Sequence, residues 1–380
     1  MSSHGLPHVD RQKMVRQLLN EMEANGGLSL LTLGAGPLAT AAISVKQGGL
    51  GFSLTDCAVL QRELATRSPS LAIAFNMHTL TVGLMADHWR RHRDASWMML
   101  EGLAAAPALI ASAFAEPGGR SNLMAPSAVA RAVDGGYRVT GTKYPCSLIS
   151  SAELFCLSAR CGDEAIVCVV PRGLDGLVTN PRWLALGMAD SDTGELHLDE
   201  VFVDRRLVFH RGPLGTADDV VVSGVLWFVV LAAATYEGVL ATLIAGLPRH
   251  RPSDDQDVGL AMSLVLALRG HYRSLSIEST QDTLKGQAAL AAAMALRLHM
   301  SQVRDQVVAL ITPVYGSSIF SAESEAARLA LDSLAVHHHP PSVRASQIGL
   351  ADYQQNGTIR LDVAEGAKSE SSAVDWEGSR

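Results

Sequence analysis

The stretch from Val220 to Leu247 is apolar over nearly its whole length, and it constrains the fold of this chain more than any other segment. A run of this length can cross a membrane, but Glu237 and several glycines and other small residues interrupt it. An apolar segment that carries a carboxylate and small side chains is typical of a helix enclosed by other helices. We therefore expect a buried helix at the centre of a helical module.

The periodicity of the chain changes twice. Helical spacing of apolar residues covers the first hundred residues, and it returns from about residue 216 to about residue 337. Between these regions lie short runs rich in β-branched residues, separated by Gly, Pro, Asp and Asn. The run "HLDEVFVD" alternates apolar and polar residues, which predicts a strand with one buried face. The pattern predicts an α+β chain of helices, then an antiparallel sheet or barrel, then a helical bundle.

Composition excludes several classes of protein. The chain is 48% hydrophobic and 18% charged, with a net charge of -7, so we expect a globular fold without a basic nucleic-acid footprint. No lysine cluster suggests a membrane surface, and Met1 to Asp10 lacks the apolar core of a signal peptide. The five cysteines suit strand positions rather than a zinc site or disulfides, so we expect no metal and a reducing cytoplasm.

The segment "ASAFAEPGGRSN", residues 111–122, interrupts this aliphatic chain with a strong turn signal. Taken alone, Pro-Gly-Gly predicts a surface turn. Glycines also allow backbone N–H groups to approach a flat ring closely, where a side chain would clash. Gly118 and Gly119 suit that role, and Ser121 adds a hydroxyl donor.

Five motifs decide between these interpretations because of their order along the chain. They are "GGLGFSLTDCAVLQRELATRSPSLA", "AFAEPGGRSN", "GYRVTGTKYPCSLISSAEL", "LALGMADSDTGELHLDEVFVD" and "YGSSIFSAESEAARLALDSLA", and they lie within roughly residues 47–350. In this order they resemble the motifs of the acyl-CoA dehydrogenase superfamily. The chain departs from the family at Ala115, where threonine is usual, at Asn122, where aspartate is usual, and at Leu331, which stands for an arginine.

The resemblance implies a domain plan and a cofactor. We expect an N-terminal helical domain over residues 1–108, a central antiparallel β-barrel over 109–215, a C-terminal four-helix bundle over 216–350, and a partly flexible tail over 351–380. The family binds flavin, here FAD or FMN, and assembles as homodimers or homotetramers. The cofactor-binding residues that the resemblance implies are Phe114, Glu116, Gly118, Gly119, Ser121, Ser147, Arg249, Arg251, Gly316, Ser317 and Ser318. The arginines stand without the Phe-Gly that usually follows in the family.

The catalytic base of the resembling dehydrogenases is missing from its two known places. Thioester dehydrogenation needs a carboxylate that takes an α-proton while a hydride moves to the flavin. The position after the Arg-Asp pair holds Pro340, and the alternative position on the first bundle helix holds Phe228. Glu237 is either a displaced base or, as we favour, a glutamate on the surface of its helix.

Histidine takes the place of the acid at the C-terminal end of the bundle. "HHHPPSVRASQIGLADY" resembles the counterpart in flavin-dependent monooxygenases of the same fold, which use reduced flavin supplied by a separate reductase. Oxygen chemistry at a flavin needs hydrogen-bond donors in a dry site. The candidates are His339, Ser147 and His78, the last on an apolar helix where a structural role competes. The three consecutive histidines cannot converge on one metal, because neighbouring side chains point apart.

Three hypotheses remain. The first is a flavin-dependent monooxygenase acting on a small hydrophobic substrate, in keeping with secondary metabolism. The second is a dehydrogenase or oxidase acting on an acyl-CoA or carrier-protein thioester. The third is a catalytically silent homologue that serves as an oligomer subunit. Flavin binding separates the third from the others, and oxygen dependence separates the first from the second.

Overall fold

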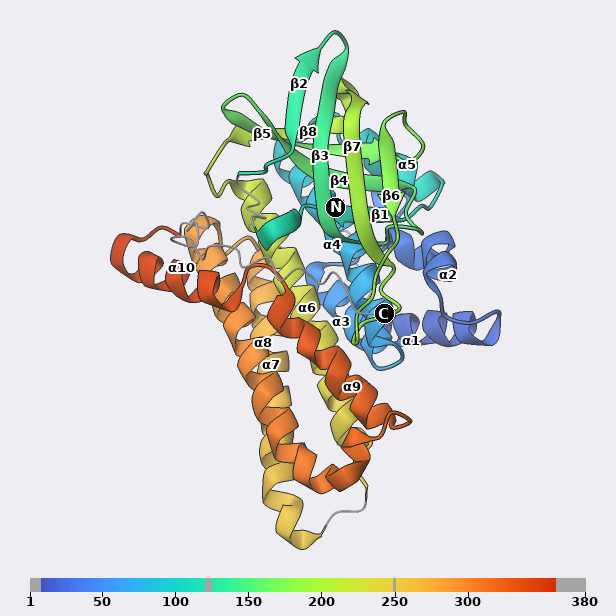
Figure 1. The fold of residues 1–380 in the computed structure, drawn as a ribbon, viewed down its shortest axis with the longest axis vertical. Coiled ribbons are helices and arrows are strands. Elements are labelled where there is room, and N and C mark those ends of the chain that lie inside the picture. Colours follow the sequence, from blue (N-terminus) through green and yellow to red (C-terminus); the bar gives the residue numbers. More distant parts are fainter. Residues whose placement is uncertain (1–7, 120–124, 249–250, 360–380) are drawn as a thin grey trace, which may run out of the picture.

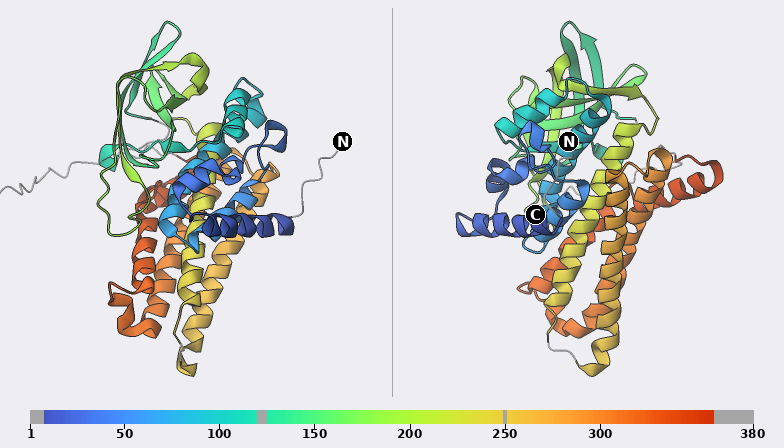
Figure 2. Two further views of the ribbon diagram at one scale, coloured as in Figure 1. Left: turned by 90° about the vertical axis from the view of Figure 1, so that its right-hand side faces the viewer. Right: turned by 180° about the vertical axis from the view of Figure 1, so that it is seen from behind.

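The computed structural model describes residues 8–119, 125–248 and 251–359. A β-sheet stands over the ends of long C-terminal helices, and the N-terminal helices pack beside the junction between them (Figure 1). Two further views in Figure 2 show the same order, with the sheet at one end of the molecule and the bundle at the other. The sequence of helices, sheet and helices is confirmed.

The N-terminal helices begin at residues that stabilise helix starts. Ser53 accepts a hydrogen bond from the N–H of Asp56, whose carboxylate accepts one from the N–H of Ser53, and this reciprocal pair forms a capping box. Ser68 caps the next long helix with its side chain. The elements are α1 (His8–Ala24), α2 (Leu30–Ala35), η1 (Pro37–Thr40), η2 (Val45–Gln47), α3 (Leu54–Ala65), α4 (Pro69–His92) and α5 (Trp97–Ala105).

Eight described strands form one sheet in the order β6-β7-β3-β2-β4-β5-β8, with β1 paired to β4. Tight turns join β2 to β3 and β4 to β5, and these neighbours are antiparallel. The elements are β1 (Ile110–Ala113), η3 (Pro117–Gly119), β2 (Val129–Val133), β3 (Gly136–Ser147), β4 (Leu154–Cys161), β5 (Glu164–Pro171), β6 (Leu177–Asn180), β7 (Thr193–Asp204), η4 (Arg205–Leu207) and β8 (Val208–Pro213).

The predicted antiparallel barrel is corrected in two respects. Strands β1 and β2 run parallel to β4, and no pairing between β6 and β8 closes the sheet within the described residues. The physical reason is that a period of two in the sequence gives the buried face of a strand but not the direction of its neighbour. Longer connections leave that direction to the tertiary structure.

The C-terminal module contains three long helices, against which shorter helices pack. Helix α6 contacts α7, α8 and α9, while α10 packs on α8. The elements are α6 (Asp219–Ala245), η5 (Pro252–Asp254), α7 (Asp255–Thr280), α8 (Gly286–Tyr315), η6 (Gly316–Phe320), α9 (Glu325–Ser333), η7 (Leu334–His338) and α10 (Val343–Asn356). The expected domain boundary at residue 350 falls inside α10, and most of the expected tail lies outside the described residues.

Helix α6 is the central helix that its apolar sequence predicts. Among the described helices it alone is long and apolar enough to cross a membrane, and 72% of that apolar stretch is buried inside the protein. It packs against α3 and α4 as well as against the other bundle helices. At its closest crossing with α4, a Cβ on Gly83 would lie 2.5 Å from the ring of Trp227, so only glycine fits there.

Candidate functional site

The turn after β1 is anchored by a buried ion pair. Glu116 is 3% exposed, and its Oε1 lies 2.6 Å from Nζ of Lys143 on β3. The same carboxylate accepts hydrogen bonds from the N–H groups of Ser127 and Ala128. Burial favours a raised pKa for Glu116, but Lys143 and these hydrogen bonds hold the pKa below its ordinary value. We therefore assign Glu116 an anchoring role in place of the direct cofactor contact that the sequence suggested.

The glycines of this turn offer backbone to a ligand. Gly118 has φ +79°, and a Cβ there would meet nothing within 4 Å, so space is open beside it. Gly119 ends the short helix η3, and Phe114 packs, partly buried, against the neighbouring core. Ser121 lies outside the described residues. A left-handed glycine beside open space suits the carbonyl and nitrogen edge of a flavin ring, so this turn fits that cofactor.

A row of hydroxyl groups lies at the same end of the sheet. Ser147, the last residue of β3, places its Oγ 2.9 Å from Oγ1 of Thr193, which lies 2.8 Å from Oγ of Ser191. The N–H of Tyr144 donates to the carbonyl of Ala115, so the glycine turn is held against this end of β3. The structure thus brings the predicted residues Gly118 and Ser147 to the same end of the sheet, where β3 ends.

The sheet meets the bundle through the segment before β7. The N–H of Met188 donates to Oδ1 of Asp332 on α9 over 2.7 Å. A Cβ on Gly187 would lie 2.8 Å from the carbonyl oxygen of Leu331, so the two backbones touch. Burial raises the pKa of Asp332, and the Met188 hydrogen bond opposes that rise. These contacts fix the position of the sheet relative to α9.

On the bundle side, His339 lies against two aromatic side chains of α6. Its Nε2 is 2.5 Å from the hydroxyl of Tyr236, and its ring is edge-on to Phe228 with a centroid distance of 5.6 Å. Although the residue keeps some exposed surface, protein surrounds the imidazole. Burial lowers the pKa of His339 to about 3, with the nearby Arg297 charge adding to the effect. The imidazole is therefore neutral at physiological pH.

The two places where a resembling dehydrogenase carries its base lie side by side. Pro340 follows His339 directly, and Phe228 is in contact with the His339 ring. Each is an apolar residue, so neither supplies a carboxylate. The structure brings an imidazole and a phenol to this place instead.

Glu237 is neither a surface residue nor a free base. It is fully buried, and its carboxylate oxygens lie 2.8 Å from Nε of Arg62 and 2.5 Å from Nη2 of Arg269. The hydroxyl of Tyr272 donates a further hydrogen bond to it. Both sequence-based interpretations of Glu237 are corrected, because the helix turns this side chain toward α3 and α7 and not toward His339.

His78 has a structural role. It is 1% exposed; its Nε2 lies 2.7 Å from the carbonyl oxygen of Ala39, and its Nδ1 accepts a hydrogen bond from the N–H of Ile110. Burial lowers its pKa to about 4. Both ring nitrogens are committed to the backbone, so we withdraw the catalytic role suggested for His78.

Comparisons with known proteins agree with this fold. Residues 111–201 match the acyl-CoA dehydrogenase middle domain. The chain is 27% identical to isobutylamine N-hydroxylase of Streptomyces viridifaciens over 94% of both chains. It is also 27% identical to mitochondrial isovaleryl-CoA dehydrogenase of Oryza sativa subsp. japonica, over 60% of this chain and 57% of that one.

The structure superimposes on KijD3, solved in complex with FMN and dTDP-3-amino-2,3,6-trideoxy-4-keto-3-methyl-D-glucose, with a TM-score of 0.75 and 21% identity over 93% of each chain. The chain thus contains an acyl-CoA dehydrogenase middle domain, and its structure has the acyl-CoA dehydrogenase-like fold. The predicted acyl-CoA dehydrogenase-like fold, apart from the closed barrel, and the predicted class, a flavin-dependent oxidoreductase, are confirmed.

Other residues that the superfamily resemblance implied lie apart from this site. Gly316, with φ +61°, begins η6, where Ser317 and Ser318 are exposed and Ser318 donates to the carbonyl of Tyr315. The N–H of Arg251 donates to Asp254 at the start of η5. Arg249 lies outside the described residues. Among the described residues of this set, no hydrogen bond or ring contact joins Arg251, Gly316, Ser317 or Ser318 to Ser147 or His339.

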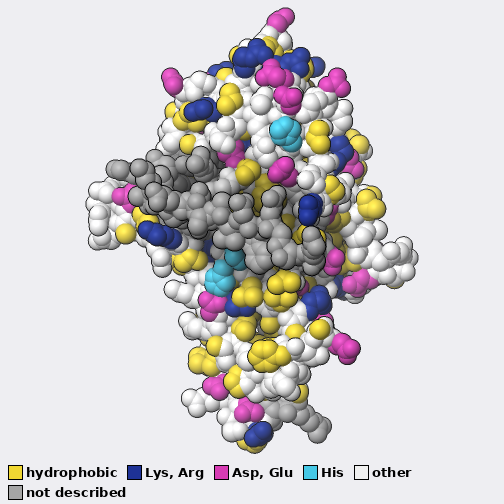
Figure 3. All heavy atoms as spheres, in the orientation of Figure 1, with side chains coloured by type: hydrophobic (Ala, Val, Ile, Leu, Met, Phe, Trp, Pro, Cys, Tyr) yellow, Lys and Arg dark blue, Asp and Glu magenta, His cyan; other side chains and the backbone are white. Residues whose placement is uncertain are grey.

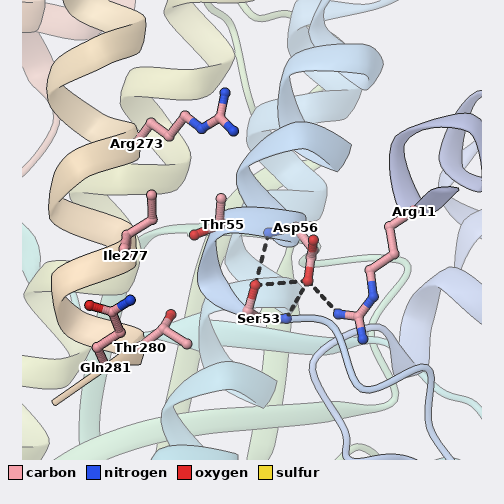
Figure 4. Close-up of a pocket in the computed structure, with 8 residues that line it drawn as sticks. All are labelled: Arg11, Ser53, Thr55, Asp56, Arg273, Ile277, Thr280 and Gln281. Atoms are coloured by element: carbon pink, nitrogen blue, oxygen red, sulfur yellow. Dashed lines mark hydrogen bonds and ion pairs between the residues drawn. The ribbon is translucent and has the colours of Figure 1, made fainter. Parts of the chain in front are cut away.

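One pocket opens elsewhere, between α1, α3 and α7. Its volume is about 410 Å³, and Figure 4 shows Arg11 paired with Asp56 on one side and Arg273 on the other. Its lining residues are Arg11, Ser53, Thr55, Asp56, Arg273, Ile277, Thr280 and Gln281. None of these is a site residue predicted from the sequence.

The sequence did not reveal three residues that shape the site. Tyr236 bonds His339, Thr193 bonds Ser147, and Arg297 of α8 holds the backbone around His339. Tyr236 and Arg297 each lie far along the chain from His339, and neither lies in a superfamily motif. Only Thr193 could have been found from the sequence, because it lies within the quoted motif "LALGMADSDTGELHLDEVFVD".

Proposed function

We propose that this protein is a flavin-dependent monooxygenase that hydroxylates the nitrogen of a small aliphatic amine. One observation carries the proposal: the two positions at which a resembling dehydrogenase holds its base are Phe228 and Pro340, and both adjoin the neutral imidazole of His339 instead of supplying a carboxylate. A site without a proton-abstracting carboxylate does not suit dehydrogenation of a thioester. Neutral hydrogen-bond donors in an aromatic setting suit oxygen transfer.

The same chemistry supports an amine as substrate. An amine attacks an electrophilic oxygen only through the lone pair of its unprotonated nitrogen, whereas a nearby carboxylate stabilises the ammonium form. Glu237 is held by two arginines, so it does not provide that carboxylate. The similarity to isobutylamine N-hydroxylase, and to a structure that holds an amino sugar nucleotide, points to the same class of substrate.

The overall reaction balances with reduced flavin as the reductant. Bound reduced flavin supplies two electrons and activates O2; one oxygen atom is transferred to the amine nitrogen and the other leaves as water. The protein contributes a dry, aromatic wall at Phe228 and hydrogen-bond donors at His339 and Ser147. Gly118 and Gly119 would place backbone N–H groups against the ring.

Further parts of the proposal concern the cofactor and the assembly. We propose FMN rather than FAD, supplied in reduced form by a separate reductase, in a cytoplasmic enzyme with domain boundaries near residues 108 and 215 and with α10 whole within the C-terminal module. If FAD binds, Gly316, Ser317 and Ser318, with Arg249 and Arg251, are the candidates for its phosphates and adenine.

Hydrophobic side chains gather on the bundle below the sheet (Figure 3), and Leu184, Leu186 and Phe320 are more than four-fifths exposed. Such exposure supports a homodimer or homotetramer.

The decisive experiment combines reduced flavin, oxygen and an amine. The purified protein is loaded anaerobically with FMNH2 and mixed with air and isobutylamine, and the hydroxylamine is measured by mass spectrometry. We expect product from the wild type and a loss of about 100-fold in His339→Gln, with hydrogen peroxide in place of product. His338→Gln, the exposed neighbour, is the matched control and should retain activity.

The second candidate function, dehydrogenation of an acyl thioester, rests on the similarity to isovaleryl-CoA dehydrogenase. It is tested by adding isovaleryl-CoA to the flavin-loaded protein without oxygen. Bleaching of the flavin would support the dehydrogenase and overturn the monooxygenase. A protein that binds neither FMN nor FAD would be the silent homologue.

A further inference from the structure

The hydroxyl of Tyr236 has a single hydrogen-bond partner. Tyr236 is fully buried on α6, and its hydroxyl lies 2.5 Å from Nε2 of His339; no other described residue bonds that hydroxyl. Burial raises the pKa of Tyr236, so the phenol keeps its proton. A buried phenol proton without an acceptor would be unfavourable, so the direction of this hydrogen bond matters.

Only one direction gives the buried phenol proton an acceptor. If Nε2 of His339 donated to the phenol, the proton of Tyr236 would point into the protein without an acceptor. If Tyr236 donates, Nε2 accepts and the single proton of the neutral imidazole must lie on Nδ1. No described residue accepts a hydrogen bond from Nδ1, so an acceptor for its proton would have to come from solvent or a bound molecule.

Hydrogen bonds from Arg297 also fix the backbone on both sides of His339. Arg297 of α8 is fully buried, and its guanidinium donates to the carbonyl oxygens of Val336, His339 and Pro341 over 2.8–3.0 Å. Its remaining terminal nitrogen lies 2.5 Å from the hydroxyl of Ser301. One side chain thus fixes the linker between α9 and α10 on both sides of the imidazole.

We propose that Tyr236 is a positioning residue that fixes the tautomer of His339, with the proton on Nδ1 as a hydrogen-bond donor toward the bound flavin and oxygen. Arg297 supports this by holding the linker in place. The role toward flavin and oxygen rests on the proposed monooxygenase function, whereas the tautomer does not. Tyr236 itself touches neither substrate nor cofactor in this assignment.

The test reads the tautomer directly. In the full-length protein labelled with 15N at histidine, the two ring nitrogens of His339 are distinguished by NMR, and His339→Gln assigns the signal. We expect the wild type to carry its proton on Nδ1, and Tyr236→Phe to lose that preference. Tyr272→Phe removes another buried hydroxyl of the bundle, which bonds Glu237, and should leave the His339 signal unchanged.

The second readout is the fate of oxygen. Tyr236→Phe should bind FMN as the wild type does but form about 10-fold less hydroxylamine, with more hydrogen peroxide, while Tyr272→Phe stays coupled. A wild-type proton on Nε2, or a tautomer unchanged by Tyr236→Phe, would overturn the inference whatever the activity. A proton on Nδ1 in a protein without amine oxidation would keep the tautomer and reject the proposed function.

Discussion

A histidine on an apolar helix has two competing roles, and the hydrogen bonds of its ring decide between them. Both ring nitrogens of His78 form hydrogen bonds with backbone groups, and these bonds link α4 to η1 and to β1. In His339, Nε2 is hydrogen-bonded to Tyr236, and Nδ1 has no hydrogen-bond partner among the described residues. The two residues look alike in the sequence as candidates for catalysis. Their difference lies in partners that are about 30 to 100 residues away in the chain.

The His78 arrangement predicts a pH dependence of stability. Its folded pKa of about 4 lies below the ordinary 6.5, so the unfolded chain binds the extra proton between these values. The contribution of His78 to the free energy of unfolding is therefore complete above about pH 6.5. It decreases by about 3 kcal/mol as the pH falls toward 4. His78→Gln should lower the unfolding free energy at pH 7 and flatten its decline with acid.

Urea unfolding at pH 7 and pH 5 measures this effect. His197→Gln, at an exposed histidine of β7, is the control and should keep the wild-type slope against pH. An unchanged slope in His78→Gln would contradict a buried neutral imidazole.

At the scale of elements, Glu237 joins three helices. It extends from α6 to Arg62 of α3 and Arg269 of α7, and all three meet in the interior. Removing the carboxylate charge leaves two arginines facing each other, at a cost of about 3 kcal/mol once partial exposure of the arginines is considered. Glu237→Gln should therefore lower stability.

Activity separates this structural role from a catalytic one. Glu237→Gln should retain its rate of amine oxidation per folded molecule, measured below its unfolding transition. Glu101→Gln, at an exposed position of α5, is the control for stability and should change it by less than about 0.5 kcal/mol. Stable protein without activity would instead identify Glu237 as a catalytic residue.

The sequence predicted where helices and strands lie along the chain better than which elements contact one another in space. Apolar spacing acts over a few residues, so helices in the first hundred residues and the buried helix α6 were expected where they lie. The parallel pairing of β1 with β4 depends on residues more than forty positions apart. Glu237 was misplaced for the same reason, because Arg62 and Arg269 are remote in sequence.

At the scale of the whole molecule, the sheet and the bundle are joined through Asp332. Its carboxylate accepts from the N–H of Met188, directly before the strand whose Thr193 bonds Ser147. The two halves of the proposed site, Ser147 on the sheet and His339 on the bundle, therefore depend on this contact for their relative position. The motif order predicted that both halves exist, but not the contact that aligns them.

Replacing Asp332 tests that dependence. Asp332→Ala should increase hydrogen exchange in the segment 183–192, lower stability by about 2 kcal/mol, and weaken FMN binding. Asp332→Asn keeps an oxygen that can accept the Met188 hydrogen bond, so it should remain close to the wild type. Equal exchange in the two variants would show that the junction is held by other contacts.

Trp227 and Phe228 are neighbours on α6 with separate surroundings. Trp227 closes on Gly83 and bonds Asp87, so any change there disturbs the crossing of two helices. Phe228 faces His339 and takes no part in that crossing. The two adjacent positions therefore differ in what a substitution would disturb: at 228 it would change the surroundings of His339, whereas at 227 it would disturb the packing of α6 on α4.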